Sequence, residues 1–320
     1  MIVLNAAETA AALPWDSLIK ALEAMFVAPS VMPVRHHHDI QVPGEPTATL
    51  LLMPAWLPGE YAGVKLVSVY PGNGSRGLPA VNGSYMLTSG STGELLAVVD
   101  GGELTARRTA AASALASQYL ARPDSETMMM IGTGRLSLNL MQAHASVHPL
   151  RRFLVWGRSE EKVEHTARMA RSLGLDAERC PDIETGVRSA DIVSCATLSE
   201  EPLVQGAWLQ PGCHVDLVGA FKPSMRESDD EVIRRAKVYV DTRAGALSEA
   251  GDIVQAIKNG VINEASIIGE LSELVAGRVP GRSERSDITL FKSVGAAIED
   301  LAAAILAYES TSSLHGIKAT

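Results

Sequence analysis

The second half of the chain alternates short apolar runs with longer segments in which apolar residues recur at helical spacing. The apolar runs predict strands at residues 128–131, 152–156, 191–195, 214–218, 237–240 and 287–291. Residues 160–173 predict a helix between two of these strands. Because continuous apolar runs are typical of strands buried on both faces, we expect an α/β fold whose doubly wound parallel sheet is covered by helices.

The first 120 residues have shorter apolar runs and many turn residues, such as Pro71-Gly72 and Asn82-Gly83. The runs predict strands at 49–53, 63–69, 84–88 and 94–99. This pattern predicts a separate, partly antiparallel α+β domain. Alanine-rich helices at 105–120 and 294–308 would connect the domains and fold back on the first one. We therefore expect two domains: residues 1–120 together with 294–320, and residues 121–293.

A glycine-rich turn follows the strand predicted at 128–131 and reads Gly132-Thr133-Gly134-Arg135-Leu136-Ser137. In a Rossmann-like domain the first glycine permits the bend, and the second lets the backbone approach a pyrophosphate at the helix N-terminus. Ser137 replaces the third glycine with another small residue. An ordinary strand-to-helix turn could have the same sequence, so the turn needs support from the next strand. With that support, Gly132 to Leu136 would hold a dinucleotide.

The next predicted strand, 152–156, ends in Gly157-Arg158-Ser159. An NAD site usually has Asp or Glu here to bind the ribose hydroxyls. A guanidinium and a hydroxyl instead suit a 2′-phosphate, which favours NADP(H), with NAD(H) as the alternative. Ser159 is also a good N-cap for the following helix, whose first turn holds Glu160 and Glu161. The two roles of Ser159 are compatible.

Composition narrows the class of protein. The chain has 320 residues with 46% hydrophobic and 4% aromatic content, enough for two domains packed mainly by small aliphatic residues. A net charge of −9 argues against a nucleic-acid partner. Cys180, Cys195 and Cys213 lack paired metal-ligand spacing and suggest reduced, buried thiols. No signal-peptide pattern or membrane-length apolar stretch occurs, so we expect a cytoplasmic protein without a membrane partner.

Cationic residues among apolar or small neighbours are the candidates for chemistry: Arg35, Lys65 and Arg108. A buried ammonium such as that of Lys65 is costly unless paired, and its pKa moves readily toward the range of proton transfer. The alternative for Lys65 is an edge-strand lysine that reaches water. Arg107 and Arg108 are adjacent on a helix and point about 100° apart, so we expect one of them to be a solvated surface charge.

The triplet His36-His37-His38 does not predict a metal site, because adjacent side chains of an extended segment alternate in direction. One of the three is a candidate to line a substrate cleft beside Arg35. No serine or cysteine lies in a nucleophile pattern, so covalent catalysis has no support.

Four pairs of segments together resemble the ornithine cyclodeaminase and mu-crystallin family over nearly the whole chain. They are 53–56 with 65–67, 95–101 with 104–111, 240–243 with 249–252, and 289–295 with 299–300. The resemblance implies that Arg35 and Arg108 bind a substrate carboxylate and that Lys65 contacts the substrate at the reacting centre. It also implies a homodimer formed by the first domain. Further cofactor contacts are expected from Ala196, Thr197, Val218 and Ser293.

One departure from the family bears on mechanism. Cyclodeaminases of the family carry an aspartate in a Gly-Ala-Asp pattern after the strand at 214–218, where this chain reads Gly219-Ala220-Phe221. A phenyl ring can neither accept a proton nor orient water. The chain therefore resembles the ketimine reductase branch, which implies NADPH-dependent reduction of Δ1-pyrroline-2-carboxylate or Δ1-piperideine-2-carboxylate to L-proline or L-pipecolate. The alternatives are ornithine cyclodeaminase, alanine dehydrogenase and a mu-crystallin-like NADPH-dependent binding protein. Lys65 together with both arginines favours catalysis over binding alone.

Overall fold

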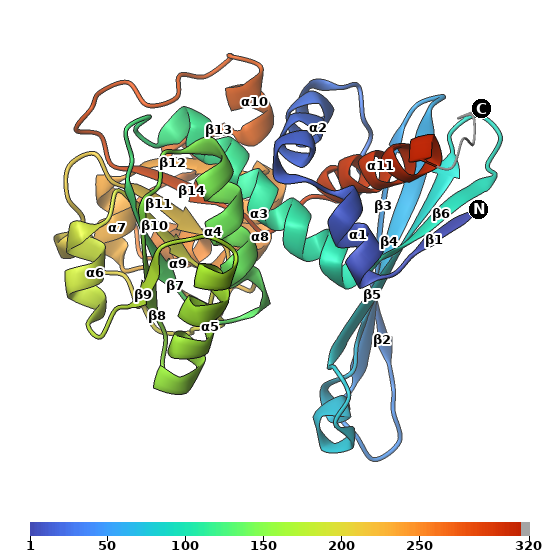
Figure 1. The fold of residues 1–320 in the computed structure, drawn as a ribbon, viewed down its shortest axis with the longest axis horizontal. Coiled ribbons are helices and arrows are strands. Elements are labelled where there is room, and N and C mark those ends of the chain that lie inside the picture. Colours follow the sequence, from blue (N-terminus) through green and yellow to red (C-terminus); the bar gives the residue numbers. More distant parts are fainter. Residues whose placement is uncertain (315–320) are drawn as a thin grey trace. The chain divides into compact units, whose positions relative to one another are not determined.

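The computed structural model describes residues 1–314 and divides the chain into two compact units (Figure 1). The first unit comprises Met1–Arg108 and the chain from Ala297 onward, and the second comprises Thr109–Ala296. The chain therefore passes between them within α3 (Gly101–Leu120) and at the start of α11 (Ala297–Leu314). The roles predicted for the two domains stay predictions.

The first unit is built on a six-stranded sheet in the order β1-β6-β5-β4-β3-β2. Its strands are β1 (Ile2–Leu4), β2 (His36–Ile40), β3 (Ala48–Leu57), β4 (Tyr61–Val69), β5 (Val81–Ser89) and β6 (Leu95–Asp100). Neighbouring strands are antiparallel except β1 and β6, and a short 3-10 turn, Pro71–Arg76, joins β4 to β5. The helices beside the sheet are α1 (Ala6–Ala12), α2 (Trp15–Val27) and α11, which packs against β3, β4 and α2.

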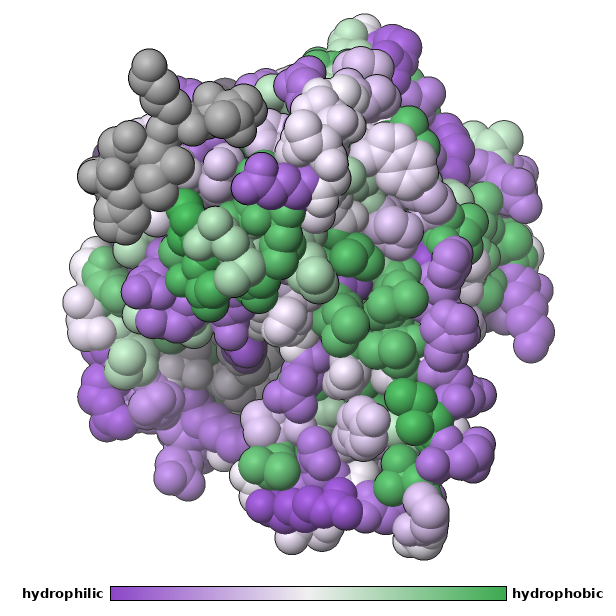
Figure 2. All heavy atoms as spheres, turned by 90° about the vertical axis from the view of Figure 1, so that its right-hand side faces the viewer, coloured by the Kyte–Doolittle hydropathy of each residue, from purple (hydrophilic) through white to green (hydrophobic). Residues whose placement is uncertain are grey.

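The two faces of this sheet differ in exposure. One cross-strand row consists of Met53, Lys65, Tyr85, Val99 and Leu4, all of them buried. The adjacent row on the opposite face is also apolar, yet its members are half-buried or exposed: Pro54, Val64, Met86, Val98 and Val3. Hydrophobic side chains gather on this outer face (Figure 2). Exposed apolar patches are often sites of protein–protein interaction.

The second unit is a parallel sheet of eight strands in the order β13-β12-β14-β11-β10-β7-β8-β9. The strands are β7 (Thr127–Ile131), β8 (Arg152–Trp156), β9 (Ala177–Arg179), β10 (Ile192–Cys195), β11 (His214–Leu217), β12 (Lys237–Val240), β13 (Ile267–Glu270) and β14 (Thr289–Lys292). The helices are α4 (Arg135–Val147), α5 (Glu160–Ser172), α6 (Ile183–Ser189), α7 (Asp230–Arg235), α8 (Arg243–Glu249), α9 (Gly251–Lys258) and α10 (Leu271–Val275), with 3-10 turns at Gly206–Trp208 and Glu264–Ser266.

This topology confirms the predicted α/β fold. Met128, Met129 and Met130 are fully buried, as expected of a central strand. From β7 the chain proceeds outward to β8 and β9, and then returns to build β10 and β11 on the other side. The order of strands thus reverses between β7 and β10. Ligands of such sheets bind at the carboxyl ends of the strands beside this reversal.

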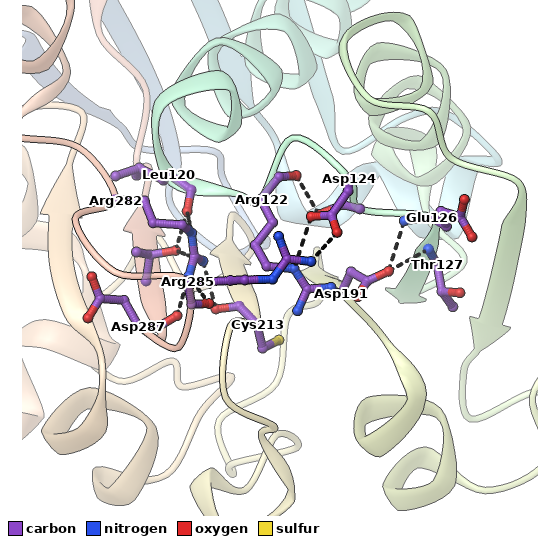
Figure 3. A network of polar contacts seen from close by, with 12 residues as sticks. Leu120, Arg122, Asp124, Glu126, Thr127, Asp191, Cys213, Arg282, Arg285 and Asp287 are labelled. Atoms are coloured by element: carbon purple, nitrogen blue, oxygen red, sulfur yellow. Dashed lines mark hydrogen bonds and ion pairs between the residues drawn. The ribbon is translucent and has the colours of Figure 1, made fainter.

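The opposite, amino-terminal edge of the same sheet is closed by polar contacts (Figure 3). The Asp191 carboxylate accepts hydrogen bonds from the backbone N–H groups of Glu126 and Thr127, at 2.8 and 3.0 Å, and also pairs with Arg122. Arg282 donates to the carbonyl of Leu120 at 2.8 Å and to the hydroxyl of Thr289 at 3.0 Å. These contacts tie together the segments before β7, β10 and β14, while the dinucleotide site is expected at the carboxyl edge beside the strand-order reversal.

Several predicted element boundaries are wrong, each for a local reason. Helix α3 begins at Gly101 rather than 105, because the Asp100 carboxylate caps it by accepting from the N–H of Glu103 at 2.7 Å. Helix α11 begins at Ala297 rather than 294, because the N–H groups of Val294 and Gly295 bind Asp241 instead, at 2.7 and 2.6 Å. Within residues 1–314, no helix is both long and apolar enough to span a membrane.

Candidate active site

The turn after β7 has the conformation that a dinucleotide requires. Gly132 has φ +118°, and a Cβ there would lie 2.6 Å from the carbonyl oxygen of Ala196, so no other residue fits. Gly134 is the N-cap of α4 without a capping side chain, and space is open beside it. Ser137 replaces the third glycine and donates to the carbonyl of Gly132 at 2.9 Å, which tightens the turn. A helix N-terminus of this form suits a pyrophosphate.

The predicted adenosine-side residues lie at the neighbouring strand end. A Cβ on Gly157 would lie 3.0 Å from a side-chain carbon of Thr133, so the ends of β7 and β8 are in contact there. Arg158 is exposed, and Ser159 caps α5 by accepting from the N–H of Lys162 at 3.4 Å. The capping role of Ser159 is therefore present, and its hydroxyl proton remains able to donate to another group.

The other predicted cofactor residues follow strands across the reversal point. Ala196 and Thr197 follow β10, Val218 follows β11, and Ser293 follows β14. Ser293 is buried and donates to Asp241 at 3.2 Å. The structure thus brings the predicted cofactor residues to one edge of one sheet, and these residues fit a dinucleotide.

In the first unit, two of the predicted substrate residues meet at one carboxylate. Lys65 Nζ lies 2.6 Å from Asp300 Oδ2, and Arg108 Nε donates to Asp300 Oδ1 at 2.9 Å. Arg108 Nη1 also donates to Glu299 Oε2 at 2.6 Å. Both carboxylates are fully buried, and Lys65 is 2% and Arg108 5% exposed. The alternative of an edge-strand lysine is wrong, since β4 lies between β3 and β5.

The electrostatics of this cluster poise Lys65 for proton transfer. Burial lowers the pKa of Lys65 to about 8, against the opposing effect of Asp300 and with a further lowering by Arg108. Burial also opposes the charge of Arg108, but Asp300 and Glu299 outweigh it and hold its pKa above the usual value. The arginine therefore stays a fixed cation. The lysine can hold or release a proton near neutral pH.

Tyr85 is a neighbour of Lys65 that the sequence did not reveal. It lies beside Lys65 in the cross-strand row, fully buried, and within residues 1–314 its hydroxyl has no hydrogen-bond partner. Burial and Asp300 raise its pKa, so it stays protonated. A Cβ on Gly63 would lie 2.3 Å from the hydroxyl oxygen of Tyr85, so Gly63 makes room for the ring. Only the register of β4 and β5 places Tyr85 beside Lys65, and a single sequence does not give that register.

Arg35 is half-buried and directly precedes β2. His36, the next residue, pairs with Leu52 of β3, the strand beside that of Lys65. His36, His37 and His38 lie exposed on β2, and within the described chain no group of His, Cys, Asp or Glu could hold a metal.

Arg107 is not the solvated charge that we expected. It donates to Glu103 at 3.0 Å and to the carbonyl of Leu13 at 2.9 Å, and its guanidinium lies 4.7 Å from the ring centroid of Trp15. Its contacts join α3 to the start of α2, so its role is in packing.

Comparison with known proteins decides the family. The family model of the ornithine cyclodeaminase/mu-crystallin family matches residues 1–315. The chain belongs to this family. It is 36% identical to the Δ1-pyrroline-2-carboxylate reductase of Paracoccus denitrificans, over 90% of each chain. It is also 36% identical to the ketimine reductase mu-crystallin of Rattus norvegicus, over 89% of this chain and 84% of that one.

A solved structure extends the likeness to the fold. The Δ1-pyrroline-2-carboxylate reductase of Thermococcus litoralis, in complex with NADH and L-proline, has a TM-score of 0.91 and 36% identity, with all of both chains covered. The fold and the family expected from the sequence are therefore confirmed.

Proposed function

We propose that this member of the ornithine cyclodeaminase/mu-crystallin family is an NAD(P)H-dependent oxidoreductase that reduces the C=N bond of cyclic imino acids. The substrate class is Δ1-pyrroline-2-carboxylate or Δ1-piperideine-2-carboxylate, and the products are L-proline or L-pipecolate. The observation that carries the proposal is the buried cluster of Lys65, Arg108, Glu299 and Asp300, in a chain that also holds a dinucleotide turn. The reductases named among its relatives support it.

Lys65 would act as the acid of the reaction. Its pKa of about 8 leaves a proton on Nζ at neutral pH that can be given up, and Asp300 holds that Nζ in place. A reduced nicotinamide supplies the hydride when bound. Lys65 would protonate the ring nitrogen of the imine, or place its ammonium charge beside that nitrogen. Either effect would draw electrons from the C=N carbon and make it a better hydride acceptor.

Arg108 would bind the substrate carboxylate through Nη2 of its guanidinium. Nε and Nη1 already donate to the carboxylates of Asp300 and Glu299, which leaves Nη2 for the substrate. The cluster has two cations and two carboxylates, so an added substrate carboxylate needs another cation. Arg35, directly before β2, would supply it.

The cofactor that we propose is NADP(H), with NAD(H) as the alternative. The end of β8 carries Arg158 and Ser159, whose donors suit a 2′-phosphate. We also propose a homodimer. Its interface would be the outer face of the first unit's sheet, where Val3, Met86 and Trp56 are 62%, 39% and 36% exposed.

The test is a pair of assays on the purified protein. The first measures loss of NADPH or NADH absorbance with each cyclic imino acid. The second supplies L-ornithine with NAD⁺ and measures ammonia. The proposal expects turnover in the first assay, fastest with NADPH. Turnover in the second assay alone would overturn it in favour of ornithine cyclodeaminase, despite Phe221 standing on the loop after β11.

A further inference from the structure

A second group of buried charges lies in the second unit, at the carboxyl ends of its strands: Glu227, Asp252 and Lys292. All three are fully buried. Lys292 ends β14, Asp252 lies in the first turn of α9, and Glu227 lies between β11 and α7. The proton transfer proposed above uses none of them.

Glu227 fastens the loops that follow two adjacent strands. Its Oε1 accepts from the N–H of Thr197 at 2.6 Å and from the Thr197 hydroxyl at 2.9 Å. Its Oε2 accepts from the N–H of Gly219 at 2.7 Å and of Ala220 at 3.3 Å. The two loops already touch, since a Cβ on Gly219 would lie 2.0 Å from the carbonyl oxygen of Thr197. One carboxylate therefore fixes both loops.

Asp252 holds the backbone at Glu227, and Lys292 lies beside Asp252. Asp252 Oδ1 accepts from the N–H groups of Glu227 and Ser228 and from the Ser228 hydroxyl, each at 2.9 Å. Lys292 Nζ lies 3.6 Å from Asp252 Oδ2, and within residues 1–314 it makes no hydrogen bond. Burying an ammonium that makes no hydrogen bond is costly. The attraction between its charge and the carboxylates of Asp252 and Glu227 offsets that cost.

We infer that Glu227 is a positioning residue for the nicotinamide cofactor: as a carboxylate it sets the shape of the Thr197 and Gly219 loops at the point where the strand order reverses. This inference rests on the proposed function, because the two loops are expected to line the cofactor. An acceptor-only side chain suits this position, since three backbone N–H groups that face it can only donate, and the Thr197 hydroxyl also donates to it. A proton on either oxygen would turn one acceptor into a donor aimed at an N–H group.

The groups around Glu227 place the protonation of its carboxylate near neutral pH. Burial raises the pKa of Glu227 to about 7, Lys292 opposes the rise and Asp252 adds to it. From β10, the thiol of Cys195 also faces it and stays protonated, since burial and Glu227 raise its pKa. Because the carboxylate is the form that fixes the loops, cofactor binding should weaken as the pH falls through about 7.

The test uses the purified full-length protein and the variant Glu227→Gln. The probe is NADH, which lacks the 2′-phosphate whose own protonation falls in the same pH range. The dissociation constant is measured by fluorescence titration from pH 6 to 8.5. We expect wild-type binding to weaken toward pH 6. The variant should bind NADH about tenfold more weakly at pH 8, because it loses two charge-assisted acceptor contacts. Its affinity should no longer vary with pH, because the carboxyl group that takes up the proton is gone.

The matched control is Glu270→Gln. Glu270 also ends a strand, and its Oε1 accepts from the N–H of Arg243 at 2.6 Å, but it ends β13 at the edge of the sheet. Its substitution should leave NADH affinity unchanged. Hydrogen exchange of the cofactor-free protein gives a second readout. Exchange at Thr197, Gly219 and Ala220 should accelerate in Glu227→Gln and stay slow in Glu270→Gln.

Lys292→Met tests the same idea without altering Glu227. Loss of the cation should raise the pKa of Glu227 further and move the midpoint of the pH dependence upward by about one pH unit. This variant and the wild-type titration decide the matter if Glu227→Gln does not fold. Wild-type affinity that does not vary with pH, or Glu227→Gln affinity equal to wild type, overturns the inference. A wild-type protein that binds neither NADH nor NADPH overturns the proposed function and this inference with it.

Discussion

The two units hold their buried carboxylates with different partners. In the first unit, Lys65 and Arg108 pair with the carboxylates of Asp300 and Glu299, so side chains neutralise side chains. In the second unit, Glu227 accepts mainly from the backbone N–H groups of loops. The first arrangement keeps a movable proton and a fixed cation next to each other. The second fixes the shape of two main-chain loops through Glu227, and Lys292 offsets the charge of Glu227 and Asp252.

Because the two clusters differ in this way, substitutions in them should damage different properties of the protein. Changes in the first cluster should alter turnover while leaving cofactor affinity intact. Changes in the second should alter cofactor affinity first. Single substitutions can separate the two effects.

The largest effect is expected from Lys65→Met. The variant removes the proton donor but keeps an apolar side chain of similar length in a buried position. The rate of imine reduction should fall about a thousandfold, which is the usual contribution of a general acid. NADPH affinity, measured by fluorescence titration without substrate, should not change. Turnover within a few-fold of wild type would remove Lys65 from its assigned role.

The next effect is on stability. Asp300→Asn keeps the shape of the side chain and leaves Lys65 and Arg108 facing one remaining carboxylate. Breaking a buried ion pair by removing one partner should lower the free energy of unfolding by about 3 kcal/mol. Denaturant unfolding followed by circular dichroism measures this. An unchanged midpoint would show that the cluster does not hold these cations.

A smaller effect is expected at the end of β8. Arg158→Ala removes the exposed guanidinium proposed to bind the 2′-phosphate, and should weaken NADPH binding about tenfold while leaving NADH binding unchanged. The ratio of kcat/KM for the two cofactors is the measurement. Equal losses for both cofactors would mean that the residue does not recognise the phosphate.

The smallest effect is expected from Arg107→Ala, which serves as the control for its neighbour Arg108. Arg107 contacts Glu103, Leu13 and the ring of Trp15. Its loss should cost about 1 kcal/mol of stability, with kcat and KM unchanged. A rise in substrate KM would show instead that Arg107 belongs to the carboxylate site.

The sequence predicted the second unit better than the first. Its central strands are buried on both faces and therefore read as continuous apolar runs, as Met128–Ile131 does. The strand predicted at 287–291 is instead β14 (Thr289–Lys292), because Asp287 accepts from the N–H groups of Ser283 and Glu284 and from Lys237. The polar strand β2 was missed, since its exposed His36–Ile40 has no apolar alternation.

Site residues that belong to a local sequence pattern could be predicted. Pairings between residues from distant segments could not. The turn at Gly132 and the isolated cation Lys65 stand out in the sequence. Asp300, the partner of Lys65, lies more than two hundred residues away, in a segment that only the family resemblance singled out, and its pairing with Lys65 was not predicted. Glu227 sits in a polar stretch that resembles any surface loop. Only the fold shows that it is buried.

The central claim is that Lys65, held by Asp300, supplies the proton for imine reduction, and a pH profile tests it most directly. The measurement is kcat/KM for Δ1-pyrroline-2-carboxylate from pH 6 to 10 in the wild type and in Asp300→Asn. Wild-type activity should fall as the pH rises through about 8, where Lys65 loses its proton. Asp300 raises the pKa of Lys65, so the fall should begin at lower pH in the variant. Protonation of the substrate is the same in both, so a shift between the profiles belongs to the enzyme. Profiles that coincide would contradict the claim.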